Sequence, residues 1–443
     1  MKRLNHLIVL TLLILISAPL TAQDTIRFTL QQAIDYALQH SVDIQTAELD
    51  VVKARRDVKV TTASGLPQVN GSVRYTNYPA IPVQVVPAEF FGGQPGQFID
   101  VRFGVENNMR AAIDVNQMIF DGRFFQGLKA ATAFVDLTQK QLDRSKVEAK
   151  NQVAKAYYAA QVAQKNVQIL KDNLNTVNDL YRETKALFDN GFIESIEVDR
   201  VQLTKTNIES QLESAERQVK LSLALLKFQM GMDIQQPFAL SETLDDMQLA
   251  EESLLTAAID PSARSDYKVL LLQEELGEIN TKNIRAGYFP SLYFFGTIET
   301  QAFREEFNFY NSGQWFGAGF LGVTLNVPLW DSGEKAGRIQ KQQAELRQLD
   351  IQQERLRNAI SLELMQAQNN YQDALERMND QKDNLQLAEK IYNVAVTKYN
   401  EGVGSSLEVN NAQTTLYQTQ SNYINTLYQV MVAKADLEKA LER

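Results

Sequence analysis

The stretch LFDNGFIESIEVDRVQ (residues 187–202) recurs in altered form as KYNEGVGSSLEVNNAQ (residues 398–413). Both versions carry a Gly after an Asn or Glu, then a Glu-Val pair and a closing Gln at matching positions, 211 residues apart. Self-similarity at a fixed offset indicates that one structural unit has been duplicated along the chain. The Gly in each copy suits a turn, because Gly adopts backbone angles that other residues avoid. The sequence therefore predicts two similar halves, each with a sharp turn near its end.

Apolar and small residues before each turn repeat at the same offset. They follow alternating steps of four and three residues, which is the spacing of a left-handed coiled-coil seam. The first seam comprises Ala149, Val153, Ala156, Ala160, Ala163, Val167, Leu170, Leu174, Val177, Tyr181, Thr184 and Phe188, and the second comprises Ile360, Leu364, Ala367, Tyr371, Ala374, Met378, Gln381, Leu385, Ala388, Tyr392, Ala395 and Tyr399. Twelve matching positions make a chance coincidence improbable.

Each half predicts the same order of elements. A short helix and a longer one (about 30–64 and 253–286) end at Gly and Pro residues, and two strands follow, the second at about 105–120 or 316–330. A helix of about 60 residues then leads to the turn, and a return helix ends near 230 or 441. At 1.5 Å per residue the long helix would reach about 90 Å. We expect a first repeat at 23–232, a linker at 233–252 and a second repeat at 253–443.

Residues 1–22 have the layout of a secretory signal peptide, with Lys2 and Arg3 before a short apolar run. No later run approaches the roughly 20 apolar residues of a membrane-spanning helix, so membrane entry would use strands. The expected strands alternate over about 10 residues, as outer-membrane strands do. Four strands cannot close a barrel, and open edges are not tolerated in lipid, so copies of the chain must share one. The Pro-rich and Gly-rich 79–104 loop is expected outside the cell.

The composition argues against several functions. The chain has no Cys, which excludes disulfides and an N-terminal lipid-modified Cys, so we expect no lipid anchor. Its only histidines are His6 and His40, so His-based catalytic and metal sites lack their parts. The formal net charge of −10, without a basic stripe, makes nucleic acid an unsuitable partner. We expect no enzyme activity, no cofactor and no metal.

In their order and duplication, the motifs resemble those of the TolC-like outer membrane factors. The resemblance rests on the Leu-Pro or Phe-Pro step before each first strand, the aromatic-Asp-Gly junction after each second strand, and the paired turns GFIESIEV and GVGSSLEV. It covers essentially the whole mature chain. It implies a mainly helical fold with four transmembrane strands per chain, assembled as a homotrimer with a twelve-stranded barrel in the outer membrane and a coiled-coil tunnel in the periplasm. It also implies partners: outer-membrane lipid, a periplasmic adaptor, and an inner-membrane pump of the RND or ABC type.

The resemblance implies a pore constriction at the second turn. Its positions correspond here to Tyr399, Gly404, Glu408 and Asn411. The family has an Arg at the position of Gly404 and an acidic residue at that of Asn411, so its ionic lock is absent in that form. If Glu408 lines a threefold axis, three carboxylates meet, which would raise their pKa and attract cations. Alternatively, Glu408 is a solvated glutamate at a helix start and Tyr399 packs in the coiled-coil seam.

Two further sets of residues follow from the same motifs. The hairpin tips are expected to face the adaptor through Gly191, Phe192, Ser195, Glu197, Gly402, Val403 and Ser405, with a structural role as the alternative for Glu197. The strand-to-helix junctions FDGRFFQGLKA (120–130) and WDSGEKAGRIQ (330–340) place Asp121, Gly122, Asp331 and Gly333 where a strand becomes a long helix. An Asp beside a helix start can cap its free N–H groups.

The sequence thus predicts an outer-membrane exit duct of a tripartite efflux pump or type I secretion system. Such a duct passively conducts substrate from the pump and adaptor to the outside. The main alternative is a periplasmic coiled-coil scaffold that conducts nothing, which would have no need of alternating, aromatic-rich strands beside long loops. A carboxylate-dependent periplasmic hydrolase is a more distant alternative, without a pocket signature.

Overall fold

The computed structural model describes residues 26–244, 252–311 and 313–442. The expected signal peptide (1–22) and the 245–251 part of the expected linker lie outside the described residues. The chain divides into two units. The helical unit comprises the N-terminal part up to Leu49 together with Lys140–Lys268 and Arg355–Arg443, and the sheet unit comprises Asp50–Gln139 and Val269–Glu354.

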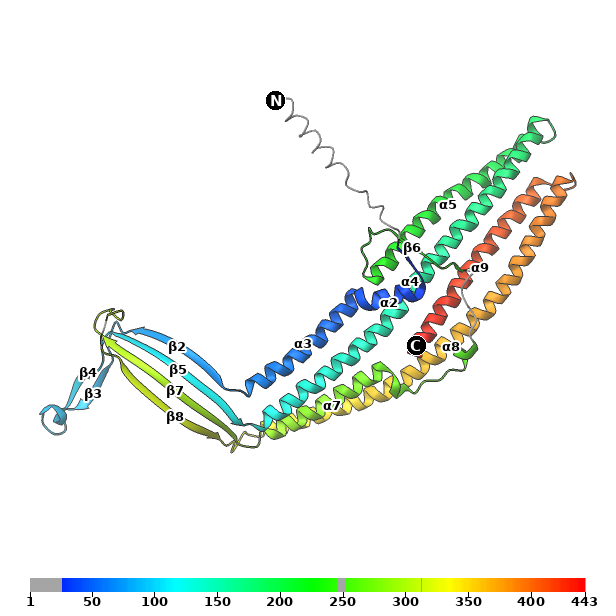
Figure 1. Ribbon diagram of the computed structural model, residues 1–443. Helices are drawn as coiled ribbons and strands as arrows, with labels where there is room; N and C mark the ends of the chain where they lie inside the picture. The colour runs from blue at the N-terminus through cyan, green and yellow to red at the C-terminus, as the bar shows by residue number, and fades with distance from the viewer. Residues whose placement is uncertain (1–25, 245–251, 312, 443) are drawn as a thin grey trace, which may run out of the picture. The chain divides into compact units, whose positions relative to one another are not determined.

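Four antiparallel strands form the main sheet of the sheet unit (Figure 1). Their order is β2 (Gln68–Asn77), β5 (Asn107–Phe120), β7 (Ser291–Arg304) and β8 (Phe316–Asn326). The pairs β2–β5 and β7–β8 are the strand pairs expected in each half, and β5 pairs with β7 to join the halves. Strands β2 and β8 are therefore the edges of the sheet within one chain, and each is paired on one side only.

The two faces of this sheet differ in polarity. One face places Ile113 opposite Ile298 and Ile298 opposite Gly319. Its exposed apolar side chains are Val69, Val73, Ile113, Ile298, Leu321, Val323 and Leu325. The other face carries a contact between Arg110 Nε and Glu299 Oε2 (2.6 Å) and a hydrogen bond from Thr297 Oγ1 to Asp114 Oδ1 (2.7 Å). We call these the apolar face and the polar face.

Two details of the strands differ from the prediction. Strand β8 ends at Asn326, not near Trp330, because Pro328 lacks the N–H group that a ladder needs. The 79–104 loop forms its own hairpin of β3 (Val83–Pro87) and β4 (Phe98–Arg102), with a 3-10 turn, η1 (Ala88–Phe91), between them. Among the described residues, none of the helices is long and apolar enough to cross a membrane.

The helices before the first strands differ between the halves. In the first half, α2 (Leu30–His40) starts with a capping box at Thr29 and is followed by α3 (Val42–Ser64). In the second half, α7 (Ser265–Ala286) corresponds to α3, but the expected short helix is reduced to α6 (Glu252–Leu255) and the 3-10 turn η3 (Pro261–Ala263). The duplication is therefore approximate at this point.

Two long antiparallel helical hairpins follow the strands (Figure 1). The first consists of α4 (Gly122–Asp189, 68 residues) and α5 (Ser195–Met230), and the second of α8 (Glu334–Asn400, 67 residues) and α9 (Ser406–Ala440). At 1.5 Å per residue, α4 and α8 are each about 100 Å long. Every seam position named above is buried or partly buried except Phe188, which is 40% exposed. The coiled-coil prediction is confirmed along nearly its whole length.

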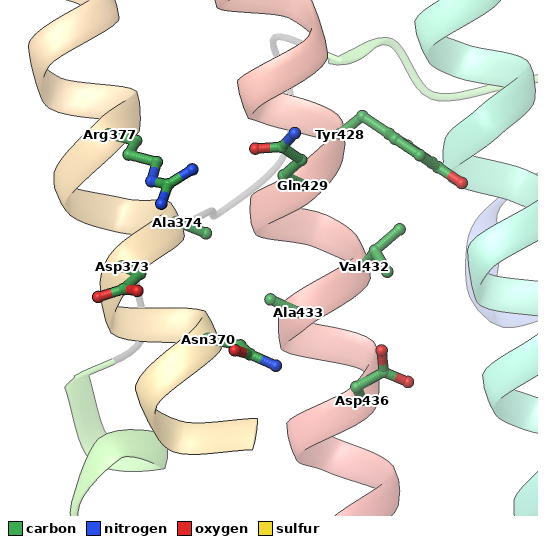
Figure 2. Close-up of a pocket in the computed structure, with 9 residues that line it drawn as sticks. All are labelled: Asn370, Asp373, Ala374, Arg377, Tyr428, Gln429, Val432, Ala433 and Asp436. Atoms are coloured by element: carbon green, nitrogen blue, oxygen red, sulfur yellow. The ribbon is translucent and has the colours of Figure 1, made fainter. Parts of the chain in front are cut away.

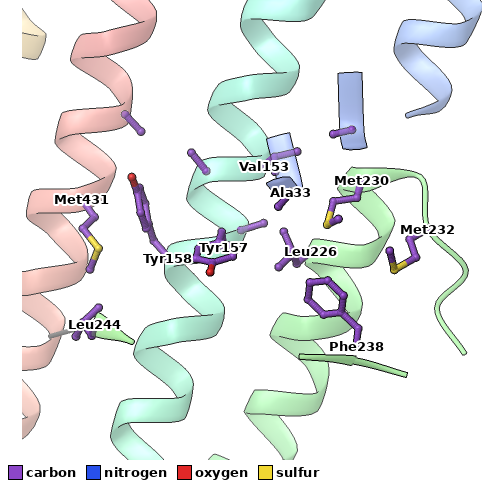
Figure 3. Packing of buried hydrophobic residues seen from close by; sticks show 14 of the residues in the cluster. Ala33, Val153, Tyr157, Tyr158, Leu226, Met230, Met232, Phe238, Leu244 and Met431 are labelled. Carbon is purple, nitrogen blue, oxygen red and sulfur yellow. The ribbon is translucent and has the colours of Figure 1, made fainter. Parts of the chain in front are cut away.

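The largest core of the helical unit surrounds the middle of α4 (Figure 3). Buried Val153 and Tyr157 of α4 lie among Ala33 of α2 and Leu226 and Met230 of α5. A short parallel pair, β1 (Ile26–Phe28) with β6 (Phe238–Leu240), lies beside this core and joins segments more than 200 residues apart. The Tyr157 hydroxyl donates to Phe28 O (3.0 Å) and contacts Glu242 Oε2 (3.2 Å). Burial raises the pKa of Tyr157, so this hydroxyl stays protonated as a donor.

Candidate functional site: the hairpin tips and strand-to-helix junctions

Both hairpin tips have the same backbone geometry. Gly191 and Gly402 have positive φ angles of 78° and 75°. The N–H of the next residue reaches back to the helix end, from Phe192 to Leu187 O (2.9 Å) and from Val403 to Lys398 O (3.0 Å). This is a Schellman motif, which ends a helix and favours Gly because other residues are strained at positive φ. The expected turn role of both glycines is therefore confirmed.

Each tip exposes an apolar side chain immediately after its Gly. Phe192 is 76% exposed and Val403 is 77% exposed. Further exposed apolar side chains lie beside them, Ile196 after the first turn and Leu407 after the second. Apolar groups gathered at one exposed point mark a surface that a partner can cover.

The tips differ in how the return helix is capped. Ser405 Oγ accepts a hydrogen bond from the backbone N–H of Glu408 (3.2 Å) at the start of α9. Glu194 occupies the corresponding place before α5, and its side chain makes no capping hydrogen bond. Ser195 is the first residue of α5 and is exposed. The second tip is therefore the better capped of the two.

Glu408 is exposed and paired with a cation of its own chain. Lys398 Nζ lies 3.1 Å from Glu408 Oε1, and both side chains are about half exposed. An open groove of about 580 Å³ between α8 and α9 is lined by these two residues and Asn411, among others. The repeat partner Glu197 differs: its Oε1 lies 3.6 Å from Arg200 Nη1, whereas its Oε2 is buried without a hydrogen-bond partner among the described residues.

Tyr399 and Gly404 lie on either side of Gly402 in the second turn, and both are partly buried. Tyr399 packs on the small cluster of Ala395, Val409 and Ala412, and its hydroxyl lies 3.2 Å from Thr184 Oγ1 of α4. A Cβ atom added at Gly404 would lie 2.9 Å from Lys398 Cβ and 3.0 Å from Tyr399 N. A side chain at position 404 would therefore collide with the end of α8 unless the turn shifted.

Neutral hydrogen bonds connect the two hairpins above the tips. Thr204 Oγ1 of α5 contacts Asn410 Oδ1 of α9 (2.8 Å), and Gln413 Nε2 of α9 donates to Asn173 Oδ1 of α4 (3.0 Å). Together with the Thr184–Tyr399 contact, these polar links between hairpins involve no charged group. Sequence reasoning did not find Thr184, Thr204 or Asn173 as partners, because their contacts join positions about 200 or more residues apart. The closing Gln of the second turn motif, Gln413, was the one available signal.

The two junction aspartates accept backbone hydrogen bonds, as capping residues do. Asp121 Oδ1 accepts from the N–H of Arg123 (2.9 Å), and Asp121 Oδ2 accepts from Arg123 Nη2 (2.8 Å) and the Tyr293 hydroxyl (2.9 Å). The hydrogen bond from the Arg123 guanidinium lowers the pKa of the Asp121 carboxyl. Asp331 accepts from the N–H groups of Gly333 (3.1 Å) and Lys335 (3.2 Å), and the Lys335 side chain lowers its pKa.

The two junction glycines serve different purposes. Gly333 has a φ of 82°, and it follows Ser332, which also has a positive φ (55°). Gly122 already belongs to α4, and a Cβ added there would meet Ala286 Cβ at 3.3 Å. Gly333 is thus a turn residue, whereas Gly122 allows a close approach between α4 and the end of α7.

A second groove, of about 300 Å³, lies between α8 and α9 away from the tip (Figure 2). Its lining residues include Asp373 and Arg377 of α8 and Gln429 and Asp436 of α9. Within the described ranges there is no group of three or more His, Cys, Asp or Glu residues placed to hold a metal ion. We regard this groove as a solvated helix surface.

The known proteins that resemble this chain agree with this architecture. Residues 33–232 and 272–443 match the protein family described as outer membrane efflux protein, and these two segments cover most of the chain. The chain belongs to the outer membrane efflux protein family. Its two matched segments end in the two hairpins described above.

Individual relatives of this efflux protein are distant in sequence. It is 22% identical over 419 residues to the pyoverdine export outer membrane protein OpmQ of Pseudomonas aeruginosa, covering 93% of this chain and 84% of OpmQ. Its fold is similar to that of the outer membrane protein VceC of Vibrio cholerae (TM-score 0.68, 18% identity, 93% and 95% of the two chains). It is also similar to that of the CmeC outer membrane channel of Campylobacter jejuni (TM-score 0.69, 16% identity, 93% and 85%).

Family membership confirms the main expectations from the sequence. The efflux protein is an outer-membrane exit duct of a Gram-negative bacterium that extends into the periplasm. The family consists of transport ducts and not of enzymes. The TolC-like fold class is confirmed by the solved relatives.

Proposed function

We propose that three copies of the chain form one passive duct, which works with a periplasmic adaptor and an inner-membrane pump of the RND or ABC type. In this proposal the repeats at 23–232 and 253–443, joined by the linker at 233–252, each supply one strand pair and one hairpin. The observation that carries the proposal is the four-stranded sheet, which has one apolar face, one polar face and two open edges. A pump that consumes energy drives the transport, and the duct supplies the path.

The sheet supports the membrane part of this proposal. Exposed apolar side chains on one face suit lipid, and the charged and amide groups of the other face suit water. The unpaired N–H and C=O groups of β2 and β8 cannot remain open in lipid, where each would cost several kcal/mol. Pairing β2 of one copy with β8 of the next satisfies these groups, and three copies give twelve strands. A barrel of this size has room for a water-filled interior.

The helices support the assembly. On α8, the exposed apolar residues Leu387, Ile391 and Val394 follow steps of four and three, the same period as the buried seam. Helix α5 likewise exposes Leu203, Leu221 and Leu225. Apolar stripes that are exposed to water do not stabilise a monomer, whereas neighbouring copies can cover them. We assign these stripes to contacts between the hairpins of adjacent copies.

The tips supply the constriction and the docking surface. Tyr399, Gly404, Glu408 and Asn411 are the proposed constriction, with Lys398 added because it pairs with Glu408. The proposed adaptor surface consists of Gly191, Phe192, Ser195, Glu197, Gly402, Val403 and Ser405, with Phe192 and Val403 as its apolar anchors. Asp121, Gly122, Asp331 and Gly333 fix the direction in which each long helix leaves the sheet.

Planar-bilayer recording of the purified oligomer tests this function. We expect channels whose conductance rises when Tyr399 and Glu408 are both replaced by Ala. Because Lys398 neutralises Glu408, we also expect Lys398→Gln to increase cation preference in a KCl gradient and Glu408→Gln to decrease it. The matched control is Lys53→Gln, which removes a lysine paired with Asp50 on α3. An oligomer that stays silent even with the double substitution would leave the non-conducting scaffold as the better description.

A further inference from the structure

Four charged residues lie on the polar face of the sheet, and three of them are engaged. Arg110 of β5 contacts Glu299 of β7, with Arg110 Nε 2.6 Å from Glu299 Oε2. Asp114 Oδ1 accepts a hydrogen bond from Thr297 Oγ1 (2.7 Å). The fourth, Arg74 of β2, lies directly opposite Arg110 in the register. The polar face therefore places two arginines side by side, and the acidic partner is bound to only one of them.

Arg74 is exposed and its side chain makes no hydrogen bond or ion pair with any described residue. Of the two acids of the polar face, Glu299 compensates Arg110, whereas Asp114 accepts its hydrogen bond from the uncharged hydroxyl of Thr297. Two arginines on adjacent strands repel each other, so the pair Arg110–Glu299 reduces this repulsion without providing an acceptor for Arg74. Among the described residues of one chain, Arg74 is a free cation.

Strand β8 of a neighbouring copy would not neutralise Arg74. This step rests on the proposed function, in which the open edge of β2 pairs with β8 of the next copy. Strand β8 reads FGAGFLGVTLN from Phe316 to Asn326 and contains no charged residue. No acidic side chain of that strand can therefore pair with Arg74. Because Arg74 alternates with the lipid-facing Val73 and Tyr75 along β2, its side chain points to the interior.

We infer that the Arg74 residues of the three copies form a belt of unpaired cations inside the barrel. This belt favours the passage of anionic solutes. Rings of basic side chains select anions, because fixed positive charge in a narrow water-filled path raises the local anion concentration. The chain as a whole carries a net charge of −10, so the positive charge of the belt is opposite in sign to the net charge of the protein. Arg74 is thus a specificity-determining residue that is independent of the constriction at the tips.

Thiol labelling tests this inference without requiring the tips to open. The chain contains no Cys, so Ser72→Cys, two residues from Arg74 on the same face, introduces the only thiol. It is reacted in lipid vesicles with a sulfonate-bearing and with a trimethylammonium-bearing methanethiosulfonate. We expect the anionic reagent to react faster, and the ratio of the two rates to fall about fivefold when Arg74→Gln is added at low salt. The control Arg55→Gln, an exposed arginine of α3, should leave the ratio unchanged.

Two other outcomes are informative. A rate ratio that is the same with and without Arg74→Gln would overturn the inference while leaving the duct intact. Val73→Cys, on the opposite face, should be protected by lipid from both reagents. If Val73→Cys reacts as fast as Ser72→Cys, the assignment of the faces is wrong. Both the proposed barrel and the belt of Arg74 cations then fail.

The consequence for transport is measured separately. In a planar bilayer with a KCl gradient, we expect Arg74→Glu to shift the reversal potential toward cation selectivity relative to the unchanged protein. An unchanged reversal potential in a conducting channel would contradict a role for Arg74 in selectivity. Absence of any conductance would instead contradict the proposed duct itself.

Discussion

At the scale of single residues, the Gly at position 404 affects which residue can supply the positive charge of the second tip. Only hydrogen fits at Gly404, because a Cβ atom would lie 2.9 Å from Lys398 Cβ. The cation of this tip is instead Lys398, on the other side of the turn, where it reaches Glu408 at 3.1 Å. An exposed pair of this kind contributes little stability, about 0–1 kcal/mol. Its value lies in setting the charge of the tip.

The two caps allow a matched comparison. Ser405→Ala removes the acceptor of the Glu408 N–H and should destabilise the first turn of α9 by about 1 kcal/mol. Glu194→Ala changes the corresponding residue before α5, where no side-chain cap exists, and should have little effect. Amide hydrogen exchange at the first turns of α9 and α5 measures the effects of both substitutions. Equal acceleration of exchange in the two variants would show that the Ser405 hydrogen bond is not formed in solution.

Asp121 makes the sheet-to-helix junction sensitive to acid. The Arg123 guanidinium lowers the pKa of this carboxyl in the folded protein. The stabilisation is therefore present above the unfolded value of about 4 and is lost as the pH falls through the lower folded value. Because Asp121 is buried, Asp121→Asn should cost about 1–3 kcal/mol at pH 7.

Thermal unfolding at pH 7 and at successively lower pH measures this effect. The difference between the unchanged protein and Asp121→Asn should shrink as the pH falls below about 4. Asp179→Asn is the control, because this exposed aspartate has Arg182 of the same helix as its sole ion-pair partner among the described residues. A difference that stays constant down to pH 2 would assign the effect to packing and not to the charge.

At the scale of the elements, the seam of the first hairpin is sensitive to side-chain size. Ala160 is fully buried, and its repeat partner in the second hairpin is the fully buried Tyr371. Ala160→Leu forces extra atoms between closely packed helices and should cost about 1–3 kcal/mol. Phe188→Ala, at the exposed end of the same seam, should change stability much less. Thermal unfolding followed by circular dichroism compares the two, and a larger loss for Phe188→Ala would contradict the assigned seam.

The sequence predicted these elements to different degrees, for physical reasons. The seam was predictable because coiled-coil packing requires a local period, visible in any one stretch such as 149–188. The end of β8 was predicted four residues too late, because alternation continues to Leu329 although Pro328 removes a ladder hydrogen bond. The pair Lys398–Glu408 was missed, because only the Schellman geometry at Gly402 brings the two side chains together. The pattern of apolar residues in the sequence predicts periodic structure such as the seam. Contacts across a turn depend instead on the backbone angles of that turn.

At the scale of the whole molecule, neutral contacts hold the two hairpins together near the tips. Thr184 with Tyr399 and Thr204 with Asn410 are the links closest to the turns. If the tips separate when the duct opens, Tyr399→Phe combined with Thr204→Val should favour the open state. Each lost hydrogen bond contributes about 0.5–1.5 kcal/mol, so together they should raise the ratio of open to closed channels about 5- to 150-fold.

Single-channel recording measures the open probability of this double variant. Because uncharged links are weakly screened, its dependence on salt should match that of the unchanged protein. Tyr392→Phe is the control, since Tyr392 packs beside the same cluster and, in the described part of the chain, makes no hydrogen bond to the other hairpin. An unchanged open probability in the double variant would mean that opening does not separate α4 from α8 or α5 from α9.

The pairing of β1 with β6 imposes an order on folding. Phe28 cannot meet its partner Leu240 until more than 200 further residues have been synthesised. Until then, Ala33 and Ala37 on α2 lack the α5 residues that bury them. Local helices form in microseconds or less, whereas a pairing over such a distance must first overcome the entropy of closing a long loop. The segment that contains β1 and α2 is thus among the last to be secured in the fold.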